Sequence, residues 1–243
     1  MPPDVRRRRA LGALATLPVL LGGCAGSTLL DAPGGAVLAE SPSYRAGDRW
    51  TYRVDQLWRA APDYDETVEI VAVAPDGIDV RVISRGGSID FDRRERWIAP
   101  GLVVQGSLLD VETRRFREPL QRLRFPLAAG ATWNQWVDQV NDTLQTAGPI
   151  NRYVRVQGME RVSTPAGAFD AVRMTVIMRL DDETPFRYPT ECSHIAWYAP
   201  QVRGFVREER RAQYREKGSG HDTFAWIPVQ NEVALLTSFE PGR

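Results

Sequence analysis

The fold is organised around residues 162–172, VSTPAGAFDAV in one-letter code. Pro165 fixes φ near a value that suits a turn, and Gly167 can adopt a positive φ, so this pair favours a tight turn. The apolar residues on both sides of the turn fall at strand-like spacing. Together the turn and the two flanking runs predict a β-hairpin, with Gly167 at φ > 0. Phe169 is predicted to point into the core, beside Trp197 or Tyr198.

Strand-length runs, separated by turn residues, continue through most of the chain. Trp50, Tyr52 and Val54 alternate with polar residues, which places an aromatic and apolar face opposite a polar one. Residues 118–124 fit a helical turn as well as a strand, and the polar residues 138–151 predict a long loop or hairpin end. The predicted strands cover residues 50–55, 67–74, 78–85, 89–97, 102–105, 108–116, 153–162, 169–180, 191–198, 202–214 and 223–239.

Helices are not indicated anywhere, because no amphipathic run of ten or more residues occurs. Parallel strands would need helical crossovers, so the strands are expected to be antiparallel. The sequence therefore predicts an all-β fold in which a single antiparallel, strongly twisted sheet forms a partly closed barrel or a sandwich. Within residues 89–97 the alternation is lost at Arg93–Arg96, and a bulge or a polar edge is the predicted reason.

The N-terminus combines three features in a fixed order. Arg6–Arg9 are basic, residues 11–21 form an apolar run too short to span a bilayer, and Leu-Gly-Gly-Cys ends at Cys24. This order resembles the signal of bacterial lipoproteins. The resemblance implies removal of residues 1–23 and a lipid on Cys24 and, because Ala25 follows instead of Asp, sorting to the outer membrane, facing the periplasm. A secretory signal with an incidental cysteine is the alternative, and both the general and the twin-arginine export routes remain open.

Three ranges follow from this reading: a signal peptide at residues 1–23, a flexible tether at 24–43 and a single β domain at 44–243. Removing the signal leaves 27 basic and 30 acidic residues, a net charge of −3. That balance gives no attraction to nucleic acid, so no nucleic-acid partner is expected. The chain has only two cysteines. With Cys24 blocked by lipid, Cys192 is predicted to be a free thiol.

Three short motifs carry a second resemblance. Gly-Asp-x-Trp ends at Trp50, Pro-Ala-Gly-x-Phe ends at Phe169, and Trp-Tyr-x-Pro ends at Pro200. Their order resembles a group of uncharacterised bacterial periplasmic β-proteins and lipoproteins over residues 44–211. The resemblance implies a curved, twisted antiparallel sheet that closes partway into a barrel. It brings no known catalytic residues.

Few residues of the sequence indicate catalytic or metal-binding chemistry. Cys192 and His194 share a strand face, but a metal site needs more ligands, and His221 is the only other histidine. A buried cysteine and a hydrogen-bonded histidine are the preferred interpretation, so no metal and no cofactor are predicted. Ser219, His221 and Asp222 are consecutive or nearly so, which is typical of a loop and not of a catalytic triad. Asp181–Glu183 are interpreted as an acidic, solvated turn in preference to a calcium loop.

Arginines and tryptophans suggest the remaining possibilities. Two arginine clusters are interpreted as cross-strand ion pairs on a wet face of the sheet, with binding of an anionic glycan or lipid phosphate as the alternative. The clusters are Arg114, Arg115 and Arg117, and Arg207, Arg210 and Arg211. If the sheet curves, some of the seven tryptophans are expected to line a concave apolar groove.

The sequence therefore favours a non-enzymatic envelope lipoprotein, held at the membrane by its lipid anchor. Its curved sheet would bind an apolar ligand, a lipid or a partner protein. Two alternatives stay open: a carboxylate-dependent hydrolase acting on an envelope polymer, and a structural assembly factor. A concave pocket with paired acidic side chains would favour the hydrolase, and the absence of a ligand-sized cavity would favour the assembly factor.

Overall fold

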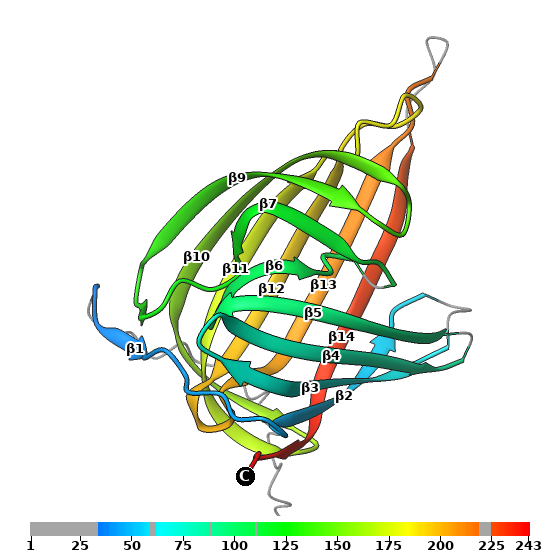
Figure 1. Cartoon of the computed structure of the whole chain (residues 1–243). Helices are drawn as coiled ribbons and strands as arrows, with labels where there is room; N and C mark the ends of the chain where they lie inside the picture. The colour runs from blue at the N-terminus through cyan, green and yellow to red at the C-terminus, as the bar shows by residue number, and fades with distance from the viewer. Residues whose placement is uncertain (1–33, 59–61, 88, 110, 219–224) are drawn as a thin grey trace, which may run out of the picture.

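The computed structural model describes residues 34–58, 62–87, 89–109, 111–218 and 225–243, and these residues form a β-barrel (Figure 1). Cys24, Ser219, His221 and Asp222 lie outside the described residues. The barrel strands are β2 (Arg49–Gln56), β3 (Tyr64–Ala74), β4 (Gly77–Gly86), β5 (Ile89–Ala99), β6 (Leu102–Gly106), β7 (Arg114–Gln121), β9 (Thr132–Asn141), β10 (Thr146–Thr164), β11 (Gly167–Leu180), β12 (Thr190–Ala199), β13 (Gly204–Arg215) and β14 (Trp226–Glu240).

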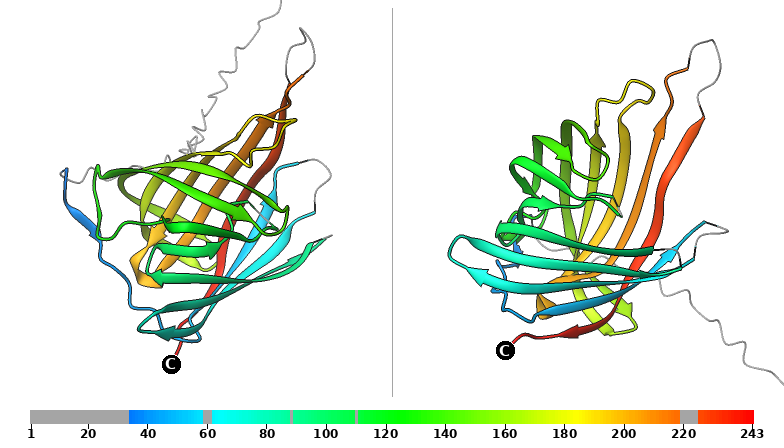
Figure 2. Two further views of the ribbon diagram at one scale, coloured as in Figure 1. Left: turned by 45° about the horizontal axis from the view of Figure 1, so that its top comes forward. Right: turned by 45° about the vertical axis from the view of Figure 1, so that its right-hand side comes forward.

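These strands pair antiparallel in the order β10-β11-β12-β13-β14-β2-β3-β4-β5-β6-β7-β9, and β9 pairs with β10 to close the ring. The predicted all-β class and antiparallel sheet are confirmed, and among the described residues the sheet closes completely. Closure gives every barrel strand a partner strand on both sides, although β7 and β9 pair only over Arg114–Phe116. β10 to β14 form a wall of long strands, and β2 to β6 cross the opposite side at a steep angle (Figure 2).

A second, two-stranded sheet lies outside this ring. β1 (Val37–Ala39) pairs with β8 (Leu127–Ala128), so a strand lies within the range expected as a tether. Ala39 and Leu127 are buried in a core cluster with Trp133 and Tyr198. Between β12 and β13 the chain forms a short 3-10 helix, η1 (Pro200–Val202). Within the described part of the chain, no helix is long and apolar enough to cross a membrane.

Where the inward-facing residues are apolar, the strands show the predicted alternation of buried and exposed side chains. Trp50, Tyr52 and Val54 of β2 are all buried, and so are Ile78, Val80 and Val82 of β4. The pairing of β4 with β5 is regular from Gly86 to Ile78. On its other side β5 pairs with β6, so the predicted polar edge is wrong, but this pairing shifts its register between Arg96 and Trp97, where the predicted bulge or irregularity is present. Arg93 and Glu95 continue the inward phase, and charged residues at inward positions also obscure the pattern.

Two other segments differ from the prediction in extent. Residues 138–151, expected as a long loop or hairpin end, form the end of the β9–β10 hairpin, where the strands pair up to Asn141 opposite Thr146. The long-loop alternative is wrong, and Gln139 and Asn141 are polar residues buried inside the barrel. The strand expected at 108–116 begins only at Arg114. Leu108 and Leu109 lie in the preceding loop, where both backbone N–H groups donate to Glu112 Oε1, at 3.1 and 2.8 Å.

The hairpin predicted at residues 162–172 is present. β10 and β11 pair up to Thr164 opposite Gly167, and Gly167 has φ +134°, as predicted. Phe169 is only partly buried and packs against the margin of the core cluster that contains Trp197. The prediction that this ring points into the core is therefore correct only in part, because the hairpin tip lies at the end of the barrel.

This position sets the first prediction. Phe169→Ala is expected to lower the free energy of unfolding by about 1.5 to 2.5 kcal/mol, half of the loss for a fully buried ring. Urea denaturation followed by circular dichroism measures it. Gly167→Val serves as a backbone control, because a Cβ there meets only the Phe169 ring, at 3.8 Å. Its cost comes from the positive φ and is about 1 kcal/mol. A loss above 3 kcal/mol for Phe169→Ala would contradict the marginal position.

Candidate ligand-binding cavity

A cavity of about 180 Å³ lies inside the barrel. Val154 of β10 and Met174, Val176 and Met178 of β11 form an apolar part of its wall, since alternate residues of each strand face inward. Aromatic side chains form much of the rest: Tyr44, Trp50, Tyr52, Trp97, Tyr198 and Phe205. A cavity of about 150 Å³ is enough to hold benzene. The barrel therefore has room for a small apolar ligand or for one end of a larger one.

Of the seven tryptophans, Trp50 and Trp97 line this cavity. Trp136 and Trp226 lie on the outside, with 63% and 42% of their surface exposed. The expected apolar groove is thus a cavity inside the barrel.

One group of charged residues on the cavity wall surrounds Glu95. Its carboxylate accepts a hydrogen bond from the indole N–H of Trp97 at 3.0 Å and forms ion pairs with Arg93 at 3.2 Å and Arg122 at 3.3 Å. Burial acts to raise the pKa of Glu95, but Arg122, Arg93 and the indole together hold that pKa below its ordinary value. Glu95 is therefore ionised at neutral pH.

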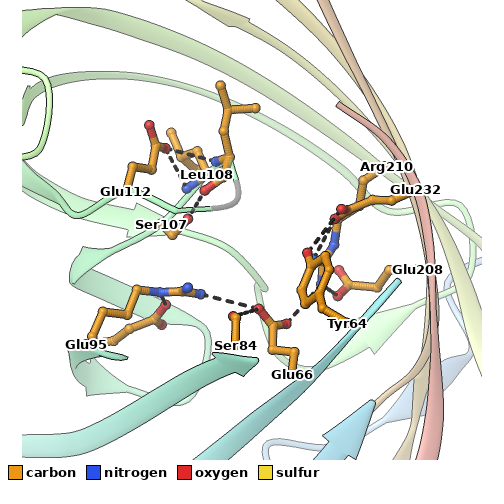
Figure 3. A network of polar contacts seen from close by, with 12 residues as sticks. Tyr64, Glu66, Ser84, Glu95, Ser107, Leu108, Glu112, Glu208, Arg210 and Glu232 are labelled. Atoms are coloured by element: carbon orange, nitrogen blue, oxygen red, sulfur yellow. Dashed lines mark hydrogen bonds and ion pairs between the residues drawn. The ribbon is translucent and has the colours of Figure 1, made fainter. Parts of the chain in front are cut away.

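A second group, the Arg210 cluster, consists of Tyr64, Glu66, Glu208, Arg210 and Glu232 (Figure 3). The Arg210 guanidinium lies 2.5 Å from Glu208, 3.0 Å from Glu232 and 3.5 Å from Glu66. The Tyr64 hydroxyl donates to Glu232 at 3.1 Å. Burial opposes the charge of Arg210, but the three carboxylates raise its pKa well above the ordinary value. One cation thus neutralises part of a dense group of interior carboxylates.

A third group, the Arg114 cluster, comprises Glu112, Arg114, Gln139, Asn141 and Asp182, and its arginine does not line the cavity. Arg114 has no exposed surface and lies 2.7 Å from Glu112 and 2.6 Å from Asp182. The amides of Gln139 and Asn141 donate to the same two carboxylates. Burial acts to raise the pKa of Asp182, whereas Arg114 lowers it, with a net decrease. Every charged member has a partner, which indicates a structural role.

Two sequence interpretations need correction here. Arg114 and Arg210 were expected on a wet face of the sheet, but both point into the barrel, where they meet buried carboxylates. Asp182 is a buried ion-pair partner and not part of a solvated acidic turn. The prediction holds for Arg115 and Arg117, which are exposed and form ion pairs with Asp142, directly after β9, and with Asp138 of β9.

Cys192 and His194 lie on the inward face of β12, and only His194 lines the cavity. Cys192 is buried as a free thiol, and burial raises its pKa to about 12, which disfavours the thiolate that a nucleophile or metal ligand requires. Burial, with Arg210 and Arg152 nearby, lowers the pKa of His194 to about 3, so this ring is neutral. Among the described residues, no group of three or more His, Cys, Asp or Glu side chains is arranged to hold a metal ion.

Arg152 is a cavity residue that the sequence analysis did not identify, since it fell between a predicted loop and a predicted strand. The signal that could have found it is the run Ile150, Arg152, Val154 and Val156, whose alternation continues the inward phase of β10. All four side chains are buried. Extending the predicted strand toward the N-terminus with the same alternation would have placed Arg152 on the inward face of the sheet.

The electrostatics of Glu95 give a second prediction. A carboxylate whose pKa is lower in the folded state stabilises the fold above its unfolded pKa, about 4.3, and loses that contribution as pH falls through the folded pKa. Glu95→Gln is therefore expected to be less stable than the parent at pH 7, and the difference should shrink below pH 4. Urea denaturation of both proteins at pH 7 and pH 3.5 measures this. A difference that stays the same at both pH values would contradict the pKa direction.

Comparison with known proteins gives one family match. A DUF3108-like family model matches residues 134–221, which include most of β9 and all of β10 to β13. This match agrees with the resemblance to uncharacterised bacterial β-proteins. A comparison with curated proteins finds no match.

Two crystal structures are similar to this chain. One is a Bacteroides fragilis protein described as exported and as having a YmcC-like fold, with 12% identity and a TM-score of 0.49 over 83% of this chain and 99% of that chain. The other is a Parabacteroides distasonis protein described as a lipoprotein, with 11% identity and a TM-score of 0.44 over 86% of this chain and 100% of that chain.

Proposed function

We propose that this protein is a non-enzymatic lipoprotein of the bacterial envelope that binds an apolar ligand inside its barrel. The observation that supports the proposal best is the interior cavity, whose wall combines aliphatic side chains and aromatic rings with charged and polar groups. The lipobox that ends at Cys24 supports anchoring in the outer membrane with the barrel in the periplasm.

The hydrolase alternative requires carboxylates that are available for acid and base chemistry. Glu66, Glu95 and Glu208 line the cavity, and each lies against an arginine within 4 Å. Glu95 in particular is held in the ionised form, whereas a general acid must carry a proton. The carboxylates are engaged in neutralising interior arginines, which favours ligand binding over hydrolysis.

Native mass spectrometry of the lipoprotein, purified from its own envelope in a mild detergent, tests the proposal. A bound small molecule of defined mass is expected. Val176→Phe, which adds bulk on the cavity wall, is expected to lose that mass, whereas Ile177→Phe on the outer face of the same strand should keep it. A stoichiometric protein partner without any small molecule would instead favour the assembly factor.

The anchor has a separate test. Replacing Cys24 with Ser removes the only sulfur that the lipobox offers for lipidation. The variant is expected to leave the membrane fraction or to remain unprocessed. Fractionation of cells followed by immunoblotting measures both results. A variant that is processed and membrane-bound like the parent would refute lipidation at this residue and leave the cavity proposal untouched.

A further inference from the structure

The arginines of the cavity wall differ in whether they form an ion pair. Five arginines line the cavity, and four of them form an ion pair with a carboxylate. The four pairs are Arg93 with Glu95 at 3.2 Å, Arg122 with Glu95 at 3.3 Å, Arg203 with Asp48 at 2.6 Å and Arg210 with Glu208 at 2.5 Å. Arg152 forms no ion pair with any residue of the described ranges.

Arg152 is nevertheless buried, with 7% of its surface exposed. Its Nη1 donates to the backbone carbonyl of Gln121 at 2.8 Å, and this is its one hydrogen bond within the described part of the chain. A guanidinium has five N–H donors, and burying its charge without a counter-ion is costly. Among the described residues, Arg152 is thus a buried cation with most of its donors unused, beside the apolar part of the cavity wall.

The surroundings increase that cost. Burial and the nearby Arg122 lower the pKa of Arg152 to about 9, although Glu208 acts in the opposite direction. Glu208 already lies 2.5 Å from Arg210. An anion placed beside Arg152 would favour its charged form and supply the missing partner.

We propose that Arg152 binds the anionic head group, a carboxylate or a phosphate, of a ligand whose apolar chain occupies the cavity. The inference rests on the proposed function and specifies the chemical class of the ligand. An arginine fork matches either head group through two parallel hydrogen bonds. Met178 lies opposite Arg152 in the strand register, and Val154 follows on the same face, so an apolar wall begins beside the guanidinium.

His194 adds a second polar group to this site. Its Nε2 is buried without a hydrogen-bond partner in the described part of the chain, and the ring is neutral and lines the same cavity. A neutral imidazole can donate one hydrogen bond to an anionic oxygen. The cavity volume of about 180 Å³ suits a short acyl chain.

Isothermal titration of the full lipidated protein in maltoside micelles, with protein-free micelles as reference, tests the inference. The probes are octanoate, octyl phosphate and the neutral 1-octanol. The parent is expected to bind at least one of the two anions more tightly than octanol, and the preferred anion distinguishes a carboxylate from a phosphate ligand. Arg152→Met is expected to weaken binding of that anion by about 10- to 100-fold and to leave octanol binding unchanged.

Arg155→Met, on the exposed face of the same strand, is the matched control and should bind all probes like the parent. Ligand-free Arg152→Met should melt at or above the parent temperature, because it removes an unpaired buried charge, and the Gln121 carbonyl keeps the Trp133 indole as donor. Arg152→Lys, which keeps the charge but loses the fork, should show an intermediate affinity.

The outcomes separate the two proposals. If octanol and both anions bind equally well, and Arg152→Met changes none of them, the head-group assignment is wrong and the apolar cavity stands. If Arg152→Met melts far below the parent, Arg152 is structural and the assignment is wrong as well. If the parent binds none of the three probes, the proposed function itself is contradicted.

Discussion

Replacing Arg210 with Met is expected to lower the free energy of unfolding at pH 7 by about 3 to 5 kcal/mol, the usual loss when one partner of a buried ion pair is removed. Three carboxylates, those of Glu66, Glu208 and Glu232, lie within 3.5 Å of this guanidinium. Without it they would face one another inside the barrel, with Arg93, 3.8 Å from Glu66, as the remaining cation beside them. Urea denaturation of the purified protein measures the loss.

The neighbouring Arg211 provides the control. Its side chain is exposed on the outer face of β13, so Arg211→Met should change stability by no more than about 0.5 kcal/mol. Equal losses for Arg210→Met and Arg211→Met would show that the Arg210 cluster does not contribute as its geometry indicates.

The Arg210 cluster also explains which parts of the fold could be predicted from the sequence. The alternation of apolar and polar residues predicted β2 and β4 correctly, because their inward-facing residues are apolar. In β2 these residues are Trp50, Tyr52 and Val54, which pack in the apolar core. The same alternation failed where the barrel interior is polar, as at Arg93 and Glu95 of β5. Apolar side chains alone do not fill the interior of a wide barrel. Polar residues that point inward therefore give the same sequence pattern as a strand face exposed to solvent.

The cavity was harder to predict than the fold. The expectation that aromatics would line an apolar space was sound for Trp50 and Trp97, because a curved sheet must have a concave side. Arg152 was missed because it fell between a predicted loop and a predicted strand, although its inward phase could have been followed along β10. Its significance depends on which carboxylates lie nearby, and those come from strands distant in the sequence. Only the folded structure shows that four cavity arginines have carboxylate partners and that Arg152 has none among the described residues.

Two motifs from the sequence meet in space around Trp50. The Gly-Asp-x-Trp motif supplies Asp48, which has no exposed surface and accepts a hydrogen bond from Arg203 at 2.6 Å. Trp50 donates its indole N–H to the backbone carbonyl of Val202 at 2.7 Å. Both contacts reach the segment that directly follows the Trp-Tyr-x-Pro motif ending at Pro200. The first motif is therefore joined to the residues that follow the second one, through Val202 and Arg203.

Trp50→Ala is accordingly expected to lower the free energy of unfolding by about 3 to 5 kcal/mol, as large-to-small substitutions of buried aromatics do. The ring is 3% exposed, stacks on Phe239 at 5.4 Å and meets Tyr44 edge-on at 5.9 Å. Its loss would leave a void next to the ligand cavity and the Val202 carbonyl without its indole donor. Urea denaturation measures the change, and Trp136→Ala, at a ring 63% exposed, should cost no more than about 0.5 kcal/mol.

Gly204 supplies an independent check on the same contact. A Cβ at this residue would lie 2.6 Å from the Trp50 indole nitrogen, closer than packing allows. Gly204→Ala should therefore destabilise the parent by about 1 to 3 kcal/mol through overpacking. In the Trp50→Ala background the added methyl has room, and most of that penalty should disappear. Additive losses in the double variant would mean that the indole does not occupy the space beside Gly204, and the packing between the two motifs would have to be rejected.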